Sequence, residues 1–292
     1  MHPTCDASLG CLLDTQQPDG GWAYTAANSS WTEPTCFSIM ALRTAVGPPT
    51  AIGHACEWLT RRQRPDGGWP PSPFVERSTH VTSLAVLALT GLPAYQTSVD
   101  RGVQWLLAQA GAEISIWARM ARIFTGTRTP PADHAGWPWY PGEAPWVIPT
   151  SLAICAFSRQ RNGRYSRDIE RRLGAAREFL LSRRCPDHGW NHGGLFKPDE
   201  APPSYPETTG VALLALHGIN VDIEPSLRCA EQQIRNPKSS EGRHWLQLGL
   251  RAHHRDPLPA PGRDRHWTVT QLALSIIAQV TEEGRNPFVY HA

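Results

Sequence analysis

The chain has 292 residues, of which 40% are hydrophobic and 18% are charged. The formal net charge of +2 at pH 7 is too small for the strong positive field of a nucleic-acid-binding surface, so nucleic acid is not an expected partner. Arginine is spread along the chain, as is typical of a solvent-exposed outer surface.

The cysteines are seven in number and contain no Cys-x-x-Cys pair, which argues against both a disulfide framework and a zinc cage. Residues 1–9 are polar and lack the apolar segment of a secretory signal. No apolar run approaches the roughly 18 residues of a membrane-spanning helix. We therefore expect a cytoplasmic protein.

In chain order, the first predicted feature is a loop that recurs. Asp19-Gly20-Gly21-Trp22 returns as Asp66-Gly67-Gly68-Trp69, and weaker copies end in Trp137 and Trp190. The first two tryptophans are 47 residues apart (69 − 22), which is long enough for a helical hairpin and its loops. The glycines allow a tight turn and each tryptophan can bury a large apolar surface, so the loops are expected to be structural.

Segments with helical spacing of apolar residues flank these loops. Amphipathic segments precede them at 9–17, 55–63 and 175–183, with a similar one at 99–109, and more uniformly apolar segments begin at Thr35, Thr82, Thr150, Thr209 and Thr270. From Trp to Thr the count is 13 in three copies (22 to 35, 69 to 82, 137 to 150), whereas the fourth copy carries an insertion. An apolar helix must be surrounded by protein, so the pattern predicts outer amphipathic helices alternating with inner buried ones.

Threonine at the start of each inner helix suits an N-cap or first turn, where its hydroxyl can satisfy a free N–H. Residues 113–124 and 241–253 are predicted to be further helices without the loop motif. The total is eleven or twelve helices, in five to six hairpins, and we expect one domain over residues 1–292.

Gln17-Pro18-Asp19-Gly20-Gly21-Trp22 and Gln63-Arg64-Pro65-Asp66-Gly67-Gly68-Trp69 resemble the glutamine–tryptophan repeats of squalene–hopene cyclases and related terpene cyclases. The resemblance covers roughly residues 5–280. It implies an all-α fold, an (α/α) toroid whose inner helices ring a cavity. It also implies an enzyme that protonates an isoprenoid or similar apolar polyene and guides the carbocation with aromatic walls, without a cofactor. Complete squalene–hopene-type cyclases have two such barrels, whereas this chain can supply one, so a homodimer or a partner chain is an open alternative, as is peripheral membrane contact.

The resemblance also implies a position for the catalytic proton donor. The family motif is Asp-x-Asp-Asp-Thr, with the Thr opening an inner helix and the proton donor two residues earlier. The corresponding positions here are Glu33, His80, Ile148, Glu207 and Thr268, and no copy reads Asp-x-Asp-Asp. Glu33 and Glu207 are the candidate acids, because burial in an apolar cavity raises a carboxyl pKa. Either could instead be an ordinary first-turn residue, and His80 could pair with a glutamate or be a structural histidine.

Aromatic side chains supply the candidate substrate-binding residues. Four residues before the repeat threonines stand Trp31, Trp146, Tyr205 and His266, with Ser78 in the second copy. A second group comprises Trp137, Trp139 and Tyr140, and Trp267 follows His266. Such rings stabilise cations by roughly 0.5–2 kcal/mol each, although the same rings could pack one repeat against the next.

Two alternatives stay open. Protein prenyltransferase β-subunits share the toroid and hold a catalytic zinc, but Cys36 and Cys155 lack the Asp two residues earlier that this site requires, and the His188/His192 pair is expected in a loop. No metal ligand is therefore assigned. The third reading is a non-catalytic repeat scaffold that binds a lipid-like ligand or a partner protein.

Overall fold

The computed structural model describes residues 3–25, 29–109, 136–160, 166–193, 202–236, 239–255, 268–281 and 285–290. These residues form eleven α-helices and one short 3₁₀ helix, η1 (Pro93–Tyr95), and no strand longer than an isolated bridge. The α-helices are α1 (Pro3–Asp14), α2 (Thr32–Thr44), α3 (Pro49–Arg61), α4 (Val81–Leu89), α5 (Gln96–Ala108), α7 (Val147–Ser158), α8 (Ser166–Ser182), α9 (Pro206–Ala215), α10 (Glu224–Arg235), α11 (Ser240–Ala252) and α12 (Val269–Val280). The predicted helix at 113–124 lies outside the described residues.

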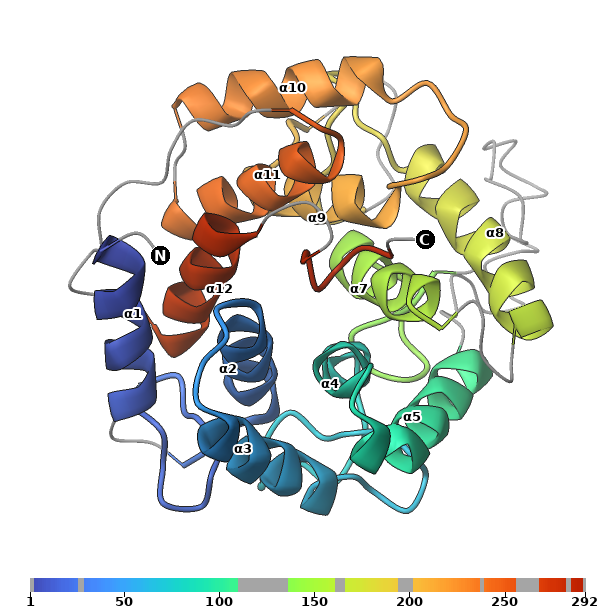
Figure 1. Cartoon of the computed structure of the whole chain (residues 1–292). Helices are drawn as coiled ribbons and strands as arrows, with labels where there is room; N and C mark the ends of the chain where they lie inside the picture. Colours follow the sequence, from blue (N-terminus) through green and yellow to red (C-terminus); the bar gives the residue numbers. More distant parts are fainter. Residues whose placement is uncertain are drawn as a thin grey trace.

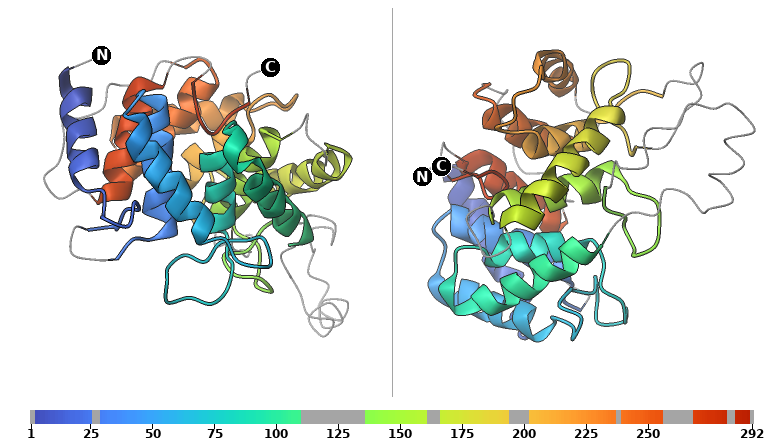
Figure 2. Two further views of the ribbon diagram at one scale, coloured as in Figure 1. Left: turned by 60° about the horizontal axis from the view of Figure 1, so that its bottom comes forward. Right: turned by 90° about the vertical axis from the view of Figure 1, so that its right-hand side faces the viewer.

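The helices form two concentric rings (Figure 1). The inner ring runs α2, α4, α7, α9, α11, α12 and back to α2, each helix packing against the next. Outside it lie α1 against α12, α3 against α2, α5 against α4, α8 against α7, and α10 against α9 and α11. The side views show the described rings as a squat barrel (Figure 2). The predicted all-α, double-ring architecture is confirmed.

The two rings differ in burial as the sequence pattern predicts. All nine residues of α4 are buried, and so is most of α7, because protein surrounds each inner helix. On the outer helix α3 only five residues are buried. Among the described helices, none is both long and apolar enough to cross a membrane.

The repeat tryptophans tie each outer helix to the following inner helix. The indole of Trp22 is fully buried, and its Nε1 donates to the carbonyl of Leu12 at 2.9 Å. Its main-chain N–H donates to the Thr35 hydroxyl at 2.9 Å, which itself donates to the Trp31 carbonyl at 2.7 Å. The same N–H to hydroxyl bond recurs at the other three copies, where it joins Trp69 to Thr82, Trp137 to Thr150 and Trp190 to Thr209.

This bond changes the role expected for the threonine. Thr35 lies inside α2 rather than at its cap, and its hydroxyl satisfies a loop N–H rather than a helix N–H. The fixed Trp-to-Thr count therefore reflects a direct hydrogen bond between the loop and the buried helix.

The Asp-Gly-Gly turn has its own set of hydrogen bonds. Asp19 accepts from the Gly21 N–H and the Ser30 hydroxyl through one oxygen, and from the Trp58 indole of α3 through the other. Gly20 has φ +95°, and a Cβ there would stand 2.7 Å from the His54 carbonyl oxygen, so glycine is required on both grounds. These loops are therefore joints between neighbouring hairpins, as expected.

The starts of the inner helices are linked around one end of the barrel. The N–H of Thr32 donates to the Pro71 carbonyl, that of His80 to Trp139 and that of Val147 to His192. Each acceptor stands two residues after the tryptophan of the next repeat. The N–H of Val269 donates to the Tyr24 carbonyl, which joins α12 to the first repeat and closes the ring.

The opposite end of the barrel is occupied by residues 285–290. This segment enters the centre of the ring beside α7 and α11 (Figure 1). Phe288 is fully buried and packs against Trp245 and Phe37, with ring centroids 5.2 and 6.3 Å apart. Nη1 of Arg159 donates to the Val289 carbonyl at 3.0 Å. The C-terminal segment therefore fills the barrel axis at this end.

Candidate functional site

Glu33 stands in the first turn of α2, at the end of the barrel where the inner helices begin. The turn is set by the main-chain bond of Thr32 to the next repeat, and Pro34 fits there because a first-turn N–H has no partner within the helix. Phe37, four residues on, faces the centre of the ring through its contact with Phe288. A spacing of four places Glu33 on the same face, so its carboxyl is directed toward the barrel interior.

Tyr24 is the direct partner of Glu33. The tyrosine follows the repeat tryptophan Trp22 in the loop before α2, and its carbonyl is fixed by the N–H of Val269. Its hydroxyl donates to Oε2 of Glu33 at 2.7 Å, and its ring packs edge to face on Trp31 at 5.5 Å. The loop that closes the ring thus also orients the carboxyl group.

Burial raises the pKa of Glu33 above its ordinary value, and the neighbouring charge of Glu241 raises it further. The Tyr24 hydrogen bond acts in the opposite direction, because it stabilises the carboxylate. Burial and the charge of Glu33 likewise raise the pKa of Tyr24, so the phenol stays protonated as a donor. The pair is a carboxyl group held toward its protonated form beside a neutral hydroxyl.

Glu241, in the first turn of α11, is a site residue that the sequence analysis did not select. Trp245 and Gln271 hydrogen bond to its side chain, which ties α11 to α12. Burial raises its pKa, and so does the charge of Glu207. The helix 241–253 was predicted, but it lacks the Trp loop and was not aligned with the inner helices. The only signal in the sequence was Glu241 standing four residues before a tryptophan.

Glu207 lies at the start of α9 and is held by α11. The hydroxyl of Ser239, the N-cap of α11, donates to Oε1 of Glu207 and accepts from the Gly242 N–H at 2.9 Å. A Cβ on Gly242 would stand 2.9 Å from that same Oε1, so the two helices approach closely at a glycine. Glu33, Glu241 and Glu207 thus form an arc across α2, α11 and α9, coupled in neighbouring pairs.

His80 lies apart from this arc, at the start of α4. Its Nδ1 is 3.3 Å from the Trp139 carbonyl, and the two rings pack edge to face at 4.3 Å. Burial lowers the pKa of His80 to about 4, so the imidazole is neutral at pH 7. It borders a space of about 10 Å³, which holds about one water molecule. These contacts are those of a structural histidine, and none joins it to Glu33 or Glu207.

The predicted aromatic residues fall into two environments. Trp31, Trp146 and Tyr205 are the N-caps of α2, α7 and α9, and Tyr205 is 39% exposed. His192 lies between the last two, with its ring 6.2 Å from Trp146 and 5.2 Å from Tyr205. These rings therefore line one rim of the barrel, next to the arc of glutamates.

The cluster at 137–140 is divided between core and surface. Trp137 is 2% exposed, with its indole bonded to the Leu106 carbonyl and the Arg172 guanidinium 3.9 Å from its ring centroid. It occupies the same structural position as the other repeat tryptophans. Trp139 covers His80, and Tyr140 is 41% exposed. The remaining candidates, His266 and Trp267, lie outside the described residues.

The structure shifts the alignment of two copies. Trp31, Trp146 and Tyr205 each donate an N–H to the carbonyl of their repeat tryptophan, and in the second copy Thr79 does so rather than Ser78. In α12 the N-cap is Thr268, which forms a capping box with Gln271. Thr268 therefore corresponds to Trp31, the N-cap of α2. Alignment on Thr270 had instead placed Thr268 at the position of the proton donor, two residues before the repeat threonine.

The ring of inner helices, closed from α12 to α2, decides the fold. The protein is an α/α toroid. It is similar to a variant of the type II terpene cyclase MstE from Scytonema in complex with geranylgeranyl dihydroxybenzoate, with a TM-score of 0.61 and 13% identity over 98% of this chain and 97% of that one. It is also similar to endoglucanase Cel10, a family 8 glycosyl hydrolase from Klebsiella pneumoniae (TM-score 0.62, 14% identity, 94% and 97% of the two chains).

A third similar toroid is an inactive variant of an α-1,6-mannanase from Salegentibacter in complex with α-1,6-mannotriose (TM-score 0.60, 9% identity, 97% and 98% of the two chains). No protein-family model matches the chain, and no curated protein sequence matches it either. At these identities the likeness establishes the toroid and leaves the reaction to the residues of the site.

Within the described ranges, no three His, Cys, Asp or Glu side chains gather in a way that could hold a metal ion. Cys36 and Cys155 are buried in the inner helices, where burial raises the pKa of both thiols. His188 has a positive φ of 68° and His192 is exposed, so both lie in a loop, as the sequence indicated.

Proposed function

We propose that this protein is a terpene-cyclase-like enzyme that acts on an isoprenoid or similar apolar polyene, with Glu33 as the proton donor. The observation that carries the proposal is the Glu33 carboxyl, which burial holds toward its acid form on the inward face of α2. A protonated carboxyl in an apolar setting can donate to an alkene, which is too weak a base for an exposed acid.

The neighbouring residues suit this chemistry. The Tyr24 hydroxyl fixes one carboxyl oxygen of Glu33, which leaves the other oxygen to carry the proton. Phe37 and Trp245 lie one turn further into the barrel, with ring centroids 5.9 Å apart, and give the acid an apolar aromatic setting. The structure of MstE with an isoprenoid-bearing substrate supports the same use of the toroid.

The test is conversion of a defined panel in deuterated buffer. Purified protein is incubated with squalene, geranylgeranyl diphosphate and geranylgeranyl dihydroxybenzoate, and products are analysed by mass spectrometry. Protonation by Glu33 should add one deuterium from solvent to each cyclised product. Glu33→Gln should abolish turnover, whereas Glu57→Gln, which alters an exposed glutamate of α3, should leave it intact. Absence of conversion across the panel, or full activity of Glu33→Gln, overturns the proposal.

A second candidate function is glycoside hydrolysis. Glu241, whose pKa is raised by burial and by the charge of Glu207, lies near that second carboxyl group at a rim that carries the exposed Tyr205. A pair of carboxyl groups, one kept as an acid, is what this reaction requires. Release of reducing ends from β-1,4-glucan or α-1,6-mannan oligosaccharides, lost in Glu207→Gln and Glu241→Gln, would establish it; no release would exclude these substrates.

Two other functions, a non-catalytic scaffold and a zinc-dependent prenyltransferase, predict different results in these experiments. If Glu33→Gln and Glu207→Gln leave the binding of an apolar ligand unchanged and no substrate is converted, the scaffold reading stands. A prenyltransferase would transfer a prenyl group to an acceptor only with bound zinc, and metal analysis of active protein decides that point.

A further inference from the structure

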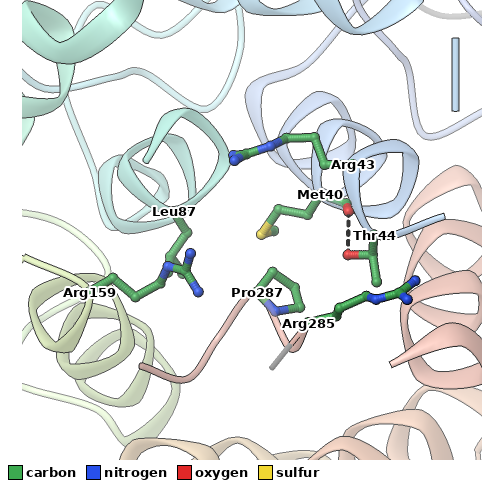
Figure 3. Close-up of a pocket in the computed structure, with 7 residues that line it drawn as sticks. All are labelled: Met40, Arg43, Thr44, Leu87, Arg159, Arg285 and Pro287. Atoms are coloured by element: carbon green, nitrogen blue, oxygen red, sulfur yellow. Dashed lines mark hydrogen bonds between the residues drawn. The ribbon is translucent and has the colours of Figure 1, made fainter. Parts of the chain in front are cut away.

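A pocket of about 180 Å³ lies at the end of the barrel opposite the glutamates (Figure 3). It is formed where α2, α4 and α7 end and residues 285–290 enter the ring. Met40 and Leu87 contribute apolar surface, and three arginines from separate segments, Arg43, Arg159 and Arg285, stand around it. Among the described residues that line the pocket, none is acidic.

The hydrogen bonds of two of these arginines run to main-chain carbonyls. Arg43 Nη1 donates to Ala88 at 2.7 Å, and Arg159 Nη1 donates to Val289 at 3.0 Å and more weakly to Asn286 at 3.4 Å. Within the described part of the chain, neither arginine forms an ion pair with a carboxylate. Nε of Arg159 is buried and has no partner there.

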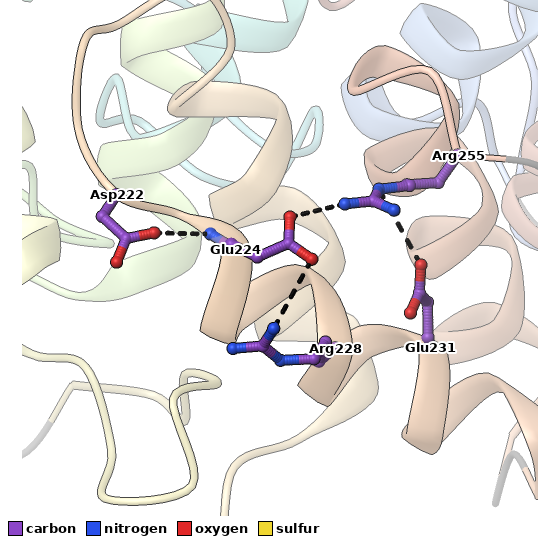
Figure 4. Close-up of polar contacts among 5 residues, drawn as sticks. All are labelled: Asp222, Glu224, Arg228, Glu231 and Arg255. Atoms are coloured by element: carbon purple, nitrogen blue, oxygen red, sulfur yellow. Dashed lines mark hydrogen bonds and ion pairs between the residues drawn. The ribbon is translucent and has the colours of Figure 1, made fainter.

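On the outer face of the barrel, by contrast, arginines are paired with carboxylates (Figure 4). Arg255 pairs with Glu224 and Glu231, and Arg228 pairs with Glu224 at 3.8 Å. There each guanidinium lies against a carboxylate at a half-exposed surface. The pocket differs from this arrangement, because Arg43 and Arg159 are partly buried and form no ion pair with a carboxylate of the described residues.

Clustering these charges has an electrostatic cost. Burial lowers the pKa of Arg43, and it lowers the pKa of Arg159, which the positive charge of Arg43 lowers further. The negative ends of α2, α4 and α7 offset part of the repulsion. Nε of Arg159 stays without an acceptor among the described residues, and the fork of N–H groups on a guanidinium matches the geometry of carboxylate or phosphate oxygens.

We propose that this pocket is a binding site for a small oxyanion, a phosphate or carboxylate group, held between Arg43 and Arg159. Its volume of about 180 Å³ is sufficient for a phosphate group. A bound anion would neutralise the mutual repulsion and give buried Nε of Arg159 an acceptor. The site lies at the far end of the barrel from Glu33 and does not depend on the acid chemistry proposed there.

The oxyanion can be a free ion or the head group of an amphipathic molecule. Equilibrium dialysis with radiolabelled inorganic phosphate, at constant ionic strength, tests the free ion. Dodecyl phosphate in competition with the labelled phosphate tests the head group. Tighter binding of dodecyl phosphate would identify the head group, and equal or weaker binding would identify the free ion.

Three arginine variants distinguish phosphate binding at this pocket from a general effect of the protein's charge. Arg43→Gln should weaken phosphate binding at least about tenfold, because it removes one charge-assisted contact and leaves the Arg159 contacts with residues 285–290 in place. Arg159→Gln should do the same or more. Arg61→Gln, which alters an exposed arginine on α3, should bind like the parent protein. Phosphate should also raise the melting temperature of the parent chain, and not that of Arg43→Gln.

Two results would overturn the proposal. One is the absence of saturable binding of both inorganic phosphate and dodecyl phosphate by the unaltered protein. The other is binding that Arg43→Gln and Arg159→Gln leave unchanged while both variants keep the circular dichroism spectrum of the parent.

Discussion

Phe37 and Trp245 meet edge to face across the barrel, and each stands four residues after a glutamate that begins its helix, Glu33 on α2 and Glu241 on α11. Because residues four apart share a helix face, two carboxyl groups lie one turn above an aromatic contact. The contact joins α2 and α11, which are far apart in sequence, and it lies beneath the carboxyl group of Glu33.

Replacing Glu33 by Gln should stabilise the fold more at high pH than at low pH. The folded pKa of Glu33 is raised, so the folded state holds the proton more tightly than the unfolded chain does. Stability from this group is complete below the ordinary pKa of 4.5 and is lost as the pH rises through the higher folded value. Thermal melts of both proteins at pH 4 and pH 8 measure this, and an equal difference at both would contradict it.

Tyr24→Phe should shift the pH profile of turnover toward higher pH. The hydroxyl of Tyr24 stabilises the carboxylate of Glu33, so its removal raises the pKa of that acid further. The protonated form would then persist to a higher pH, while substrate binding by the apolar walls changes little. Profiles of kcat and KM against pH are the measurement; a shift downward, or a change in KM alone, would show that the hydroxyl contacts substrate instead.

Phe288→Ala should cost about 3–5 kcal/mol of stability in urea unfolding, because it opens a cavity between Phe37 and Trp245. Phe74→Ala is the matched control, since that ring is 80% exposed and its loss should cost less than about 0.5 kcal/mol. A similar small cost for both would mean that residues 285–290 are not packed in the barrel.

Thr35→Val, Thr82→Val and Thr150→Val should each cost about 1–3 kcal/mol, because each leaves the buried N–H of a repeat tryptophan without its acceptor. Thr50→Val, on the exposed start of α3, should be nearly neutral. Chemical unfolding of the four proteins provides the comparison. Costs confined to one repeat would show that the bond is not a common element of the joints.

The sequence predicted the repeating part of the fold well, because local rules specify it. The count of 13 from Trp22 to Thr35 is the length of a loop closed by one hydrogen bond, and it recurs wherever that bond recurs. The alternation of amphipathic and apolar helices was predicted for the same reason, since burial sets the composition of each ring.

The candidate site was predicted only in part, because long-range contacts define it. Glu33 was selected from its position, but its partners Tyr24 and Glu241 come from a loop and from a helix without the motif. Thr268 was misaligned because Thr270 mimics the repeat threonine. The docking of Phe288 in the barrel follows from packing in three dimensions, and no local pattern announces it.

Closure of the ring has a consequence for how the polypeptide reaches its native state. In an open array of repeats, stability accumulates unit by unit along the chain. Here α2 packs against α12 on one side, and its Phe37 packs against Phe288. The apolar face of α2 is therefore not fully buried until these C-terminal segments have been synthesised. Nascent chains that end before α12 should therefore be the form that chaperones capture, and the finished ring should unfold in one cooperative step.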